Sequence, residues 1–173
     1  AIPFAGLGPG LRQAKRRVAL LTALCDLAGV WPLATVTQAL TDLAAAAVQA
    51  CIVPLVAAEI ARDKLPGLTP DDAATAGGMV VLAMGKQGAG ELNYSSDIDL
   101  ICLFDDDRFT PEDSVTARAA FVRVTRRMCA LLSDNTDQGY VFRTDLRLRP
   151  DASVMPVCLS MTAAERYYES VGR

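Results

Sequence analysis

The stretch from Leu43 to Ile60 does most to limit how this chain can fold, because almost every residue in it is apolar. Such a run is stable only when it is buried, either in a protein core or in a lipid bilayer. It contains Gln49, Pro54 and Glu59, and many of its apolar residues are alanines, which favours a buried helix over a membrane span. We therefore expect no membrane partner, and a helix over about 35–62 that Pro54 kinks or splits.

A change in composition divides the chain at residues 66–78, which are rich in proline, glycine and aspartate and read as a linker. The region before it, 1–65, reads as helical, since apolar residues also recur at helical spacing from 11 to 28. A basic cluster lies at the start of this first helix: Arg12, Lys15, Arg16 and Arg17. We expect a helical N-terminal region, a linker, and a second domain over 79–173.

The second domain has the pattern of a mixed sheet with flanking helices. Residues 79–84 (MVVLAM) and 98–104 (IDLICLF) are short, apolar and partly β-branched, which predicts two buried strands. A helix is expected from about 111 to 133. Alternation over 140–148 predicts a third strand that would place Arg143, Asp145 and Arg147 on one face. The expected fold class is α+β.

Several kinds of chemistry are excluded by composition. The chain has 0 histidines, so it can form no Ser-His-Asp triad, no His-ligated zinc site and no His general base. Its 5 cysteines form no C-x-x-C pair, which favours buried free thiols in a reducing, cytoplasmic setting over a zinc site. A net charge of -3 argues against nonspecific nucleic-acid binding, and we expect no nucleic-acid partner.

Asp97 and Asp99 are two residues apart at the start of an expected strand. Alternate residues of a strand point to the same side, so both carboxylates can face one pocket while Ile98 points into the core. Mg²⁺ prefers oxygen ligands, usually carboxylates together with substrate phosphates. Asp145, on the third expected strand, is the candidate for a third carboxylate of a metal clamp.

Each of these signals has a second interpretation. An Asp-x-Asp pair often arises by chance, and an aspartate among arginines is also typical of an ion-paired surface strand. The Gly85-Lys86 turn could present backbone N–H groups and a cation to a phosphate, or its glycine could be structural. Ser95 and Ser96 could contact phosphate or cap their turn. The candidate phosphate and nucleotide contacts are Gly85, Lys86, Ser95, Ser96, Arg143 and Arg147.

Three segments together resemble one known family. They are 80–86 (VVLAMGK, of which every residue except Val81 carries the resemblance), 90–100 (GELNYSSDIDL) and 143–150 (RTDLRLRP). They resemble the glutamine synthetase adenylyltransferases, also called glutamate–ammonia-ligase adenylyltransferases, of the DNA polymerase β-like nucleotidyltransferase superfamily. The resemblance is strong over 79–173 and looser over 11–65. Gln87 stands where the family often has Leu, and Ala152 where Gly is common.

The resemblance implies a long protein with two similar nucleotidyltransferase domains, of which this chain is expected to be a fragment. The N-terminal domain resembles a deadenylase that removes AMP from a tyrosine of glutamine synthetase by phosphorolysis, giving ADP. The C-terminal domain transfers AMP from ATP to that tyrosine, so that the protein regulates nitrogen assimilation. The cues for the N-terminal copy are the segment 93–96, Arg143 two residues before Asp145, and Tyr167-Tyr168-Glu169 leading to Gly172-Arg173.

The resemblance also assigns roles. Asp97, Asp99 and Asp145 match the family's metal-binding carboxylates, and Gly85-Lys86 matches the turn after its first strand. The implied cofactor is Mg²⁺, or Mn²⁺ in its place. The implied partners are glutamine synthetase, ATP, ADP, AMP and phosphate, with a nitrogen-signalling regulatory protein as a further partner. The alternative is a catalytically silent nucleotidyltransferase-like module that binds nucleotide or glutamine synthetase.

Overall fold

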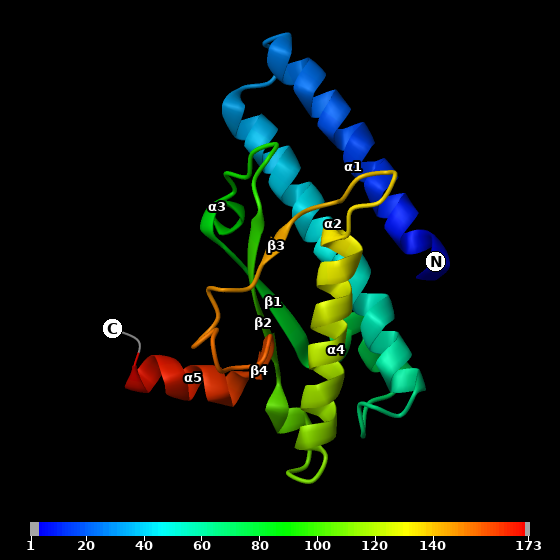
Figure 1. Cartoon of the computed structure of the whole chain (residues 1–173), viewed down its shortest axis with the longest axis vertical. Helices are drawn as coiled ribbons and strands as arrows, with labels where there is room; N and C mark the ends of the chain where they lie inside the picture. Colours follow the sequence, from blue (N-terminus) through cyan, green and yellow to red (C-terminus); the bar gives the residue numbers. More distant parts are fainter. Residues whose placement is uncertain (1–3, 172–173) are drawn as a thin grey trace. The chain divides into compact units, whose positions relative to one another are not determined.

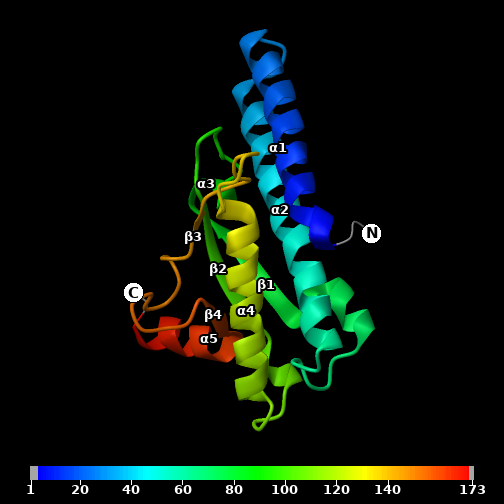
Figure 2. The same cartoon turned by 45° about the vertical axis from the view of Figure 1, so that its right-hand side comes forward.

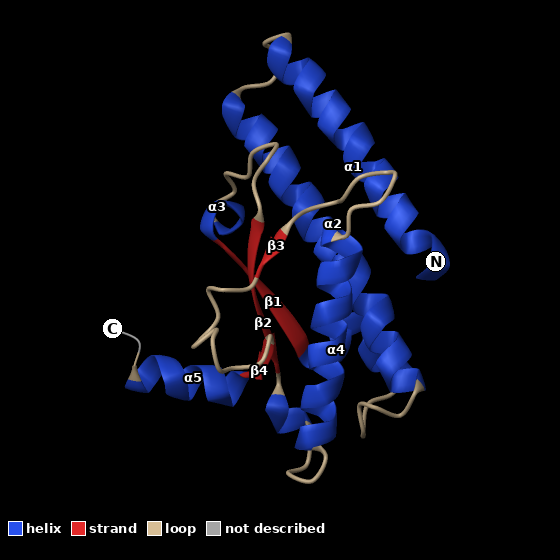
Figure 3. Cartoon of the chain, in the orientation of Figure 1, coloured by secondary structure: helices blue, strands red, loops and turns tan. Residues whose placement is uncertain are grey.

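A computed structural model of the chain describes residues 4–171. Helices dominate, at about 58% of the residues, and a small mixed sheet of four strands lies among them (Figure 3). The α+β class expected from the sequence is therefore confirmed.

The described chain divides into two compact units, and each unit consists of three separate segments of the sequence. The first unit consists of residues up to Cys51, Ala83–Asp99 and Cys129–Asp145. The second consists of Ile52–Leu82, Leu100–Met128 and the residues from Leu146 on. The boundaries expected from composition, at 1–65, 66–78 and 79–173, stay a prediction.

The first unit begins with a pair of helices. Figures 1 and 2 both show α1 (Phe4–Leu27) lying alongside the first turns of α2 (Leu33–Ala61), with a short connection at 28–32. Gly29 makes this reversal possible, because its φ of +65° is unfavourable for other residues. α1 starts earlier than expected, at Phe4 rather than at about residue 11.

The helix α2 is long and apolar enough to cross a membrane, by length and composition alone. The core helices of soluble proteins pass the same test, and 44% of its most apolar window is buried inside the protein. Toward its end, the carboxylate of Glu59 is buried and accepts hydrogen bonds from Arg123 of α4 (Ser114–Ser133). Pro54 does not split the helix, which runs unbroken from Leu33 to Ala61.

The core of the second unit is built around three phenylalanines. The rings of Phe104 and Phe121 stack with centroids 4.9 Å apart, and Phe109 packs edge-on against both. Phe104 ends one strand and Phe121 belongs to α4, so the stack joins sheet and helix. The unit also contains the 3-10 segments η1 (Pro70–Gly78) and η2 (Asp106–Arg108), the strand β4 (Cys158–Ser160) and the helix α5 (Met161–Ser170).

The two apolar runs form strands with the expected bounds, β1 (Met79–Met84) and β2 (Ile98–Phe104). β2 is mostly buried, as expected, but the burial expected for β1 was wrong, since Val80 and Leu82 are exposed. The strand order is β1-β2-β3, and β4 also pairs with β2. Pairing is parallel between β2 and β3 and between β2 and β4. Between β1 and β2 the chain forms the single turn α3 (Gly85–Gly88) and a loop.

The third strand, expected over 140–148, is limited to β3 (Thr144–Asp145), so its expected length was wrong. The backbone before β3 forms hydrogen bonds with the end of α4 instead of with a neighbouring strand. The N–H groups of Val141 and Phe142 donate to the carbonyl of Leu132 at the end of α4. After β3, Arg149 donates to the carbonyls of its own turn: Leu146, Ala152, Met155 and Pro156.

All five cysteines are free thiols, as expected. Burial raises the pKa of the Cys51 thiol to about 12, with a further contribution from Cys129. Burial also raises the pKa of the Cys158 thiol to about 12. Thiols that stay protonated at neutral pH are poor nucleophiles and metal ligands, so these two cysteines have a packing role.

Candidate active site

The central feature of the site is a pair of aspartates on neighbouring strands. In the parallel pairing of β2 with β3, Asp99 lies opposite Asp145 and Ile98 opposite Thr144. Directly opposed residues of a pleated sheet point to the same face, so the two carboxylates belong to one side of the sheet. Ile98 is fully buried, which confirms that it points into the core while its two aspartate neighbours do not.

The turn after β1 lies close against the carboxylate of Asp99. A Cβ added to Gly85 would lie 2.7 Å from Asp99 Oδ2, closer than any real Cβ contact. Gly85 also has a φ of +55°, which disfavours any residue with a side chain. The positive φ therefore favours glycine here, and an added side chain would force the carboxylate of Asp99 to shift.

Asp97 forms an ion pair with Arg143. The Arg143 Nε donates to Asp97 Oδ1 at 2.5 Å, and Arg143 Nη2 donates to the carbonyl of Ser95 at 2.9 Å. Asp97 holds the pKa of Arg143 above its ordinary value through the hydrogen bond and the opposite charge. The structure thus brings together two residues predicted for the site. Asp97, expected to bind metal, and Arg143, expected to bind phosphate, are paired with each other.

Both serines lie in a turn organised by Asn93. The Asn93 side-chain oxygen accepts from the backbone N–H of Ser95 at 3.2 Å and from the Ser96 hydroxyl at 2.7 Å. This is the capping arrangement that was the alternative to a phosphate contact. Tyr94, in the same turn, donates its hydroxyl to Asp26 of α1 at 3.1 Å.

The remaining predicted residues are placed as follows. Lys86 is exposed in α3, directly after Gly85. Arg147 is exposed and lies beyond β3, in the second unit, so its part in the site stays a prediction. Tyr167 and Tyr168 pack edge to face in α5, with ring centroids 5.5 Å apart. Gly172-Arg173, used above as a cue for the N-terminal copy, lies outside the described residues.

Comparison of the chain with known proteins shows the family to which it belongs. The model of the glutamate-ammonia ligase adenylyltransferase family matches residues 3–173. The chain belongs to this family. The bifunctional glutamine synthetase adenylyltransferase/adenylyl-removing enzyme of Bradyrhizobium diazoefficiens is 53% identical over 163 residues. Proteins of the same name from Rhodopseudomonas palustris (strain TIE-1) and Xanthobacter autotrophicus are 49% and 44% identical.

These matches cover 94% of the chain but only 16% of the length of each relative. The chain is thus similar to a small part of a long adenylyltransferase. The resemblance read from the three sequence segments is confirmed, and it extends through the helical region before residue 79.

In this adenylyltransferase-family chain, the chemistry of the donors suits a hard divalent cation. Asp99 and Asp145 are adjacent oxygen donors of the kind that Mg²⁺ prefers, and Asp97 is two residues from Asp99. Within residues 4–171, however, no three acidic, cysteine or histidine side chains already converge as a metal site. The predicted three-carboxylate site therefore stays a prediction.

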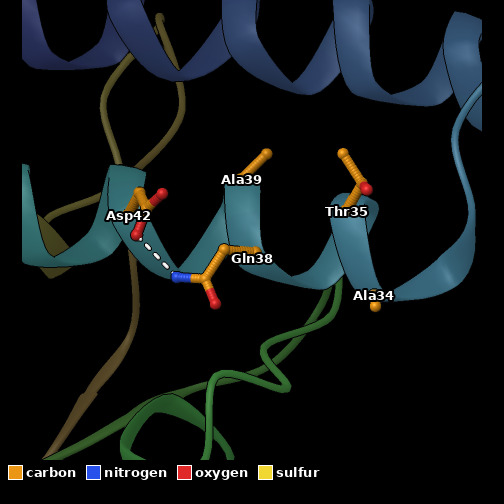
Figure 4. A pocket seen from close by; sticks show the side chains of 5 residues that line it. All are labelled: Ala34, Thr35, Gln38, Ala39 and Asp42. Atoms are coloured by element: carbon orange, nitrogen blue, oxygen red, sulfur yellow. Dashed lines mark hydrogen bonds between the residues drawn. The ribbon is translucent and has the colours of Figure 1, made fainter.

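A hollow of about 420 Å³ lies elsewhere, along the first turns of α2 (Figure 4). It is lined by Ala34, Thr35, Gln38, Ala39 and Asp42. Its one carboxylate, that of Asp42, accepts a hydrogen bond from Gln38 Nε2 at 2.7 Å. None of the predicted site residues lines this hollow, and it contains no cation to bind a phosphate, so we do not assign it to the site.

Two residues beside the site were not found from the sequence. Tyr140 accepts a hydrogen bond of 3.4 Å from Arg143, and Lys15 Nζ lies 4.4 Å from the centroid of its ring. Lys15 is more than a hundred positions away in the chain, so no local spacing could have indicated the contact. The basic cluster that contains Lys15 was the only signal.

Proposed function

We propose that this chain provides the catalytic site that removes AMP from an adenylylated tyrosine of glutamine synthetase by phosphorolysis, giving ADP. In the longer protein, a second such site would adenylylate the same tyrosine from ATP. The observation that supports the proposal is the pair of Asp99 and Asp145 on adjacent parallel strands, with Gly85 tight against Asp99. The relatives are named for both reactions on glutamine synthetase.

Asp97, Asp99 and Asp145 would hold one or two Mg²⁺ ions, or Mn²⁺ in their place. The metal would neutralise charge on the AMP phosphate and orient the incoming nucleophile. An oxygen of inorganic phosphate attacks the phosphorus of the AMP group, the bond from phosphorus to the tyrosyl oxygen breaks, and that oxygen takes the proton that the incoming hydrogenphosphate supplies. In the transfer direction, the tyrosyl oxygen attacks the α-phosphate of ATP, pyrophosphate leaves, and Asp145 would accept the tyrosyl proton.

Phosphate oxygens would be bound by the cations and donors around the carboxylates. The proposed contacts are Gly85, Lys86, Ser95, Ser96, Arg143 and Arg147. The cytoplasm is the proposed compartment, because free thiols are typical of a reducing setting. A nitrogen-signalling regulatory protein is a further proposed partner.

A second candidate is a catalytically silent module that binds nucleotide or glutamine synthetase. One observation favours it: the carboxylate of Asp97 is engaged by Arg143, and no three acidic groups converge within residues 4–171. The reaction assay separates the two candidates.

The test is to incubate the chain with adenylylated glutamine synthetase, phosphate and Mg²⁺ and to measure ADP. We expect ADP to form only when phosphate and the metal are both present. Incorporation of AMP from ATP into unmodified glutamine synthetase would instead reverse the assigned direction. Nucleotide binding without either reaction would support the silent module and contradict the proposal.

Replacing Gly85 by Ala tests whether the turn positions the carboxylate of Asp99. We expect Mn²⁺ to bind about tenfold more weakly, the effect typical of disturbing the residues that orient metal ligands. Binding is measured by electron paramagnetic resonance of free Mn²⁺, and stability by thermal unfolding.

Gly29→Ala is the matched control for this change. Gly29 also has a positive φ, +65°, but an added Cβ would meet nothing within 4 Å. Both variants share the left-handed backbone penalty of about 1–2 kcal/mol, so only Gly85→Ala should lose metal affinity. Equal Mn²⁺ affinity in the two variants would show that Gly85 does not position Asp99.

A further inference from the structure

The basic cluster at the start of α1 is fixed to the segment that leads to Arg143, and the proposed function leaves this cluster unused. Arg12 and Arg16 donate hydrogen bonds of 2.6–2.8 Å to backbone carbonyls of the loop after α4. The accepting carbonyls are those of Asp134, Gln138 and Gly139. These bonds hold the backbone that directly precedes Tyr140.

Two cations lie over the ring of Tyr140. Lys15 Nζ is 4.4 Å from the ring centroid, and Arg143 Cζ is 5.8 Å from it. Both distances are within the range at which a ring face attracts a cation. Burial, and after it the neighbouring charge of Arg143, lowers the pKa of Lys15.

The guanidinium of Arg143 is directed to three partners by three different nitrogens. Nε donates to Asp97, Nη2 to the carbonyl of Ser95 and Nη1 to the hydroxyl of Tyr140. Because the guanidinium is planar and rigid, three bonds in different directions set both its position and its tilt. Tyr140 is the only side chain among these partners that is not itself part of the predicted site.

We propose that Arg143 is an internal cation for Asp97, set in place by Tyr140, and that a divalent cation must displace it before Asp97 can bind metal. This inference rests on the proposed function, because it assumes a metal at Asp97. The displacement is feasible, since the ion pair is exposed: 53% of the Arg143 side chain and 48% of the Asp97 side chain is accessible. Ion pairs this exposed stabilise only weakly.

The competition assigns a role to the ion pair between Asp97 and Arg143, which no three-carboxylate cluster accompanies within residues 4–171. It also reconciles the two roles of Arg143, because a guanidinium released from Asp97 becomes available to the phosphate group that the metal binds. Arg143 would therefore exchange one anion for another as metal and phosphate bind.

The first test is Mn²⁺ binding to the chain without substrate, measured by electron paramagnetic resonance. Arg143→Met should tighten Mn²⁺ binding about two- to fivefold, the range expected for losing a weak competing ion pair. Tyr140→Leu should act in the same direction by about twofold, although it changes no charge. Tyr140→Phe keeps the ring but removes the hydroxyl that accepts from Arg143 Nη1, so its effect should be smaller than that of Tyr140→Leu and in the same direction.

Arg17→Met is the matched control for lost charge. It removes the same side chain from an exposed position of the same helix. Equal effects of Arg17→Met and Arg143→Met would overturn the proposal, and so would an unchanged affinity in Tyr140→Leu. If the unmodified chain binds no Mn²⁺ at all, the metal site of the proposed function fails as well.

A second measurement observes Arg143 directly, by nuclear magnetic resonance of its Nε–H group in the ¹⁵N-labelled chain. The signal, assigned by its loss in Arg143→Met, should be protected from exchange with water before metal is added. Mg²⁺ should remove this protection, and Asp97→Ala, which leaves no side-chain acceptor for Nε–H, should remove it without metal. A signal that stays protected at saturating Mg²⁺ would overturn the displacement while leaving the metal site itself intact.

Discussion

Replacing Asp99 by Asn is expected to lower the rate of ADP formation from adenylylated glutamine synthetase by on the order of a thousandfold. The change keeps the size of the side chain but removes the charge that would hold the metal. Metal ions contribute several kcal/mol of transition-state stabilisation in such sites, and about 4 kcal/mol corresponds to a thousandfold in rate. The measurement is the ADP assay under saturating Mg²⁺.

Folding of the variant is checked by circular dichroism and thermal unfolding. Asp137→Asn, which alters an exposed carboxylate in the loop after α4, is the matched control and should keep the full rate. Asp97→Asn should also be nearly inactive. Metal-dependent turnover that survives in both single variants, Asp97→Asn and Asp99→Asn, would contradict the assignment of these carboxylates.

Replacing Arg123 by Ala is expected to have the largest effect on stability, a loss of about 3 kcal/mol in the free energy of unfolding. The carboxylate of Glu59 is only 2% exposed, and it accepts from Arg123 Nη2 at 2.6 Å and Nε at 3.2 Å. Removing the guanidinium leaves a buried charge without its main partner. Denaturation by urea at pH 7 measures the change.

Arg62→Ala provides the comparison within the same cluster. Its Nη1 lies 3.6 Å from the other oxygen of Glu59, but its side chain is 58% exposed. Exposed ion pairs contribute about 0–1 kcal/mol, so this variant should stay close to the unmodified chain. The Arg123 side chain is itself 41% exposed, so the contrast lies in its two hydrogen bonds to the buried carboxylate. If Arg123→Ala costs no more than Arg62→Ala, these bonds do not stabilise the fold.

The sequence predicted the parts of the fold that depend on local pattern. The bounds of β1 and β2 follow from short apolar runs between glycines and charged residues, and both were correct. The inward direction of Ile98 follows from the period of a strand, which placed Asp97 and Asp99 away from the core. The sequence led us to expect Asp99 and Asp145 close together. The structure shows in addition that they lie directly opposite each other on neighbouring parallel strands.

What the sequence could not predict depends on contacts between distant segments. The stretch before β3 alternates like a strand, but the end of α4 takes its N–H groups, a competition that no local pattern shows. The contacts of Arg143 with Asp97 and Tyr140 likewise depend on how the loops meet. The helix α5 was missed, although Ser160, whose side chain accepts from the N–H of Ala163, is a typical N-cap signal.

The most direct test of the central claim is a crystal of the chain soaked in Mn²⁺ and examined by anomalous diffraction. A strong anomalous peak between the carboxylates of Asp99 and Asp145, with Asp97 turned from Arg143 toward it, is the predicted result. Saturating Mn²⁺ that gives no peak at these carboxylates, with Asp97 still paired to Arg143, would contradict the account.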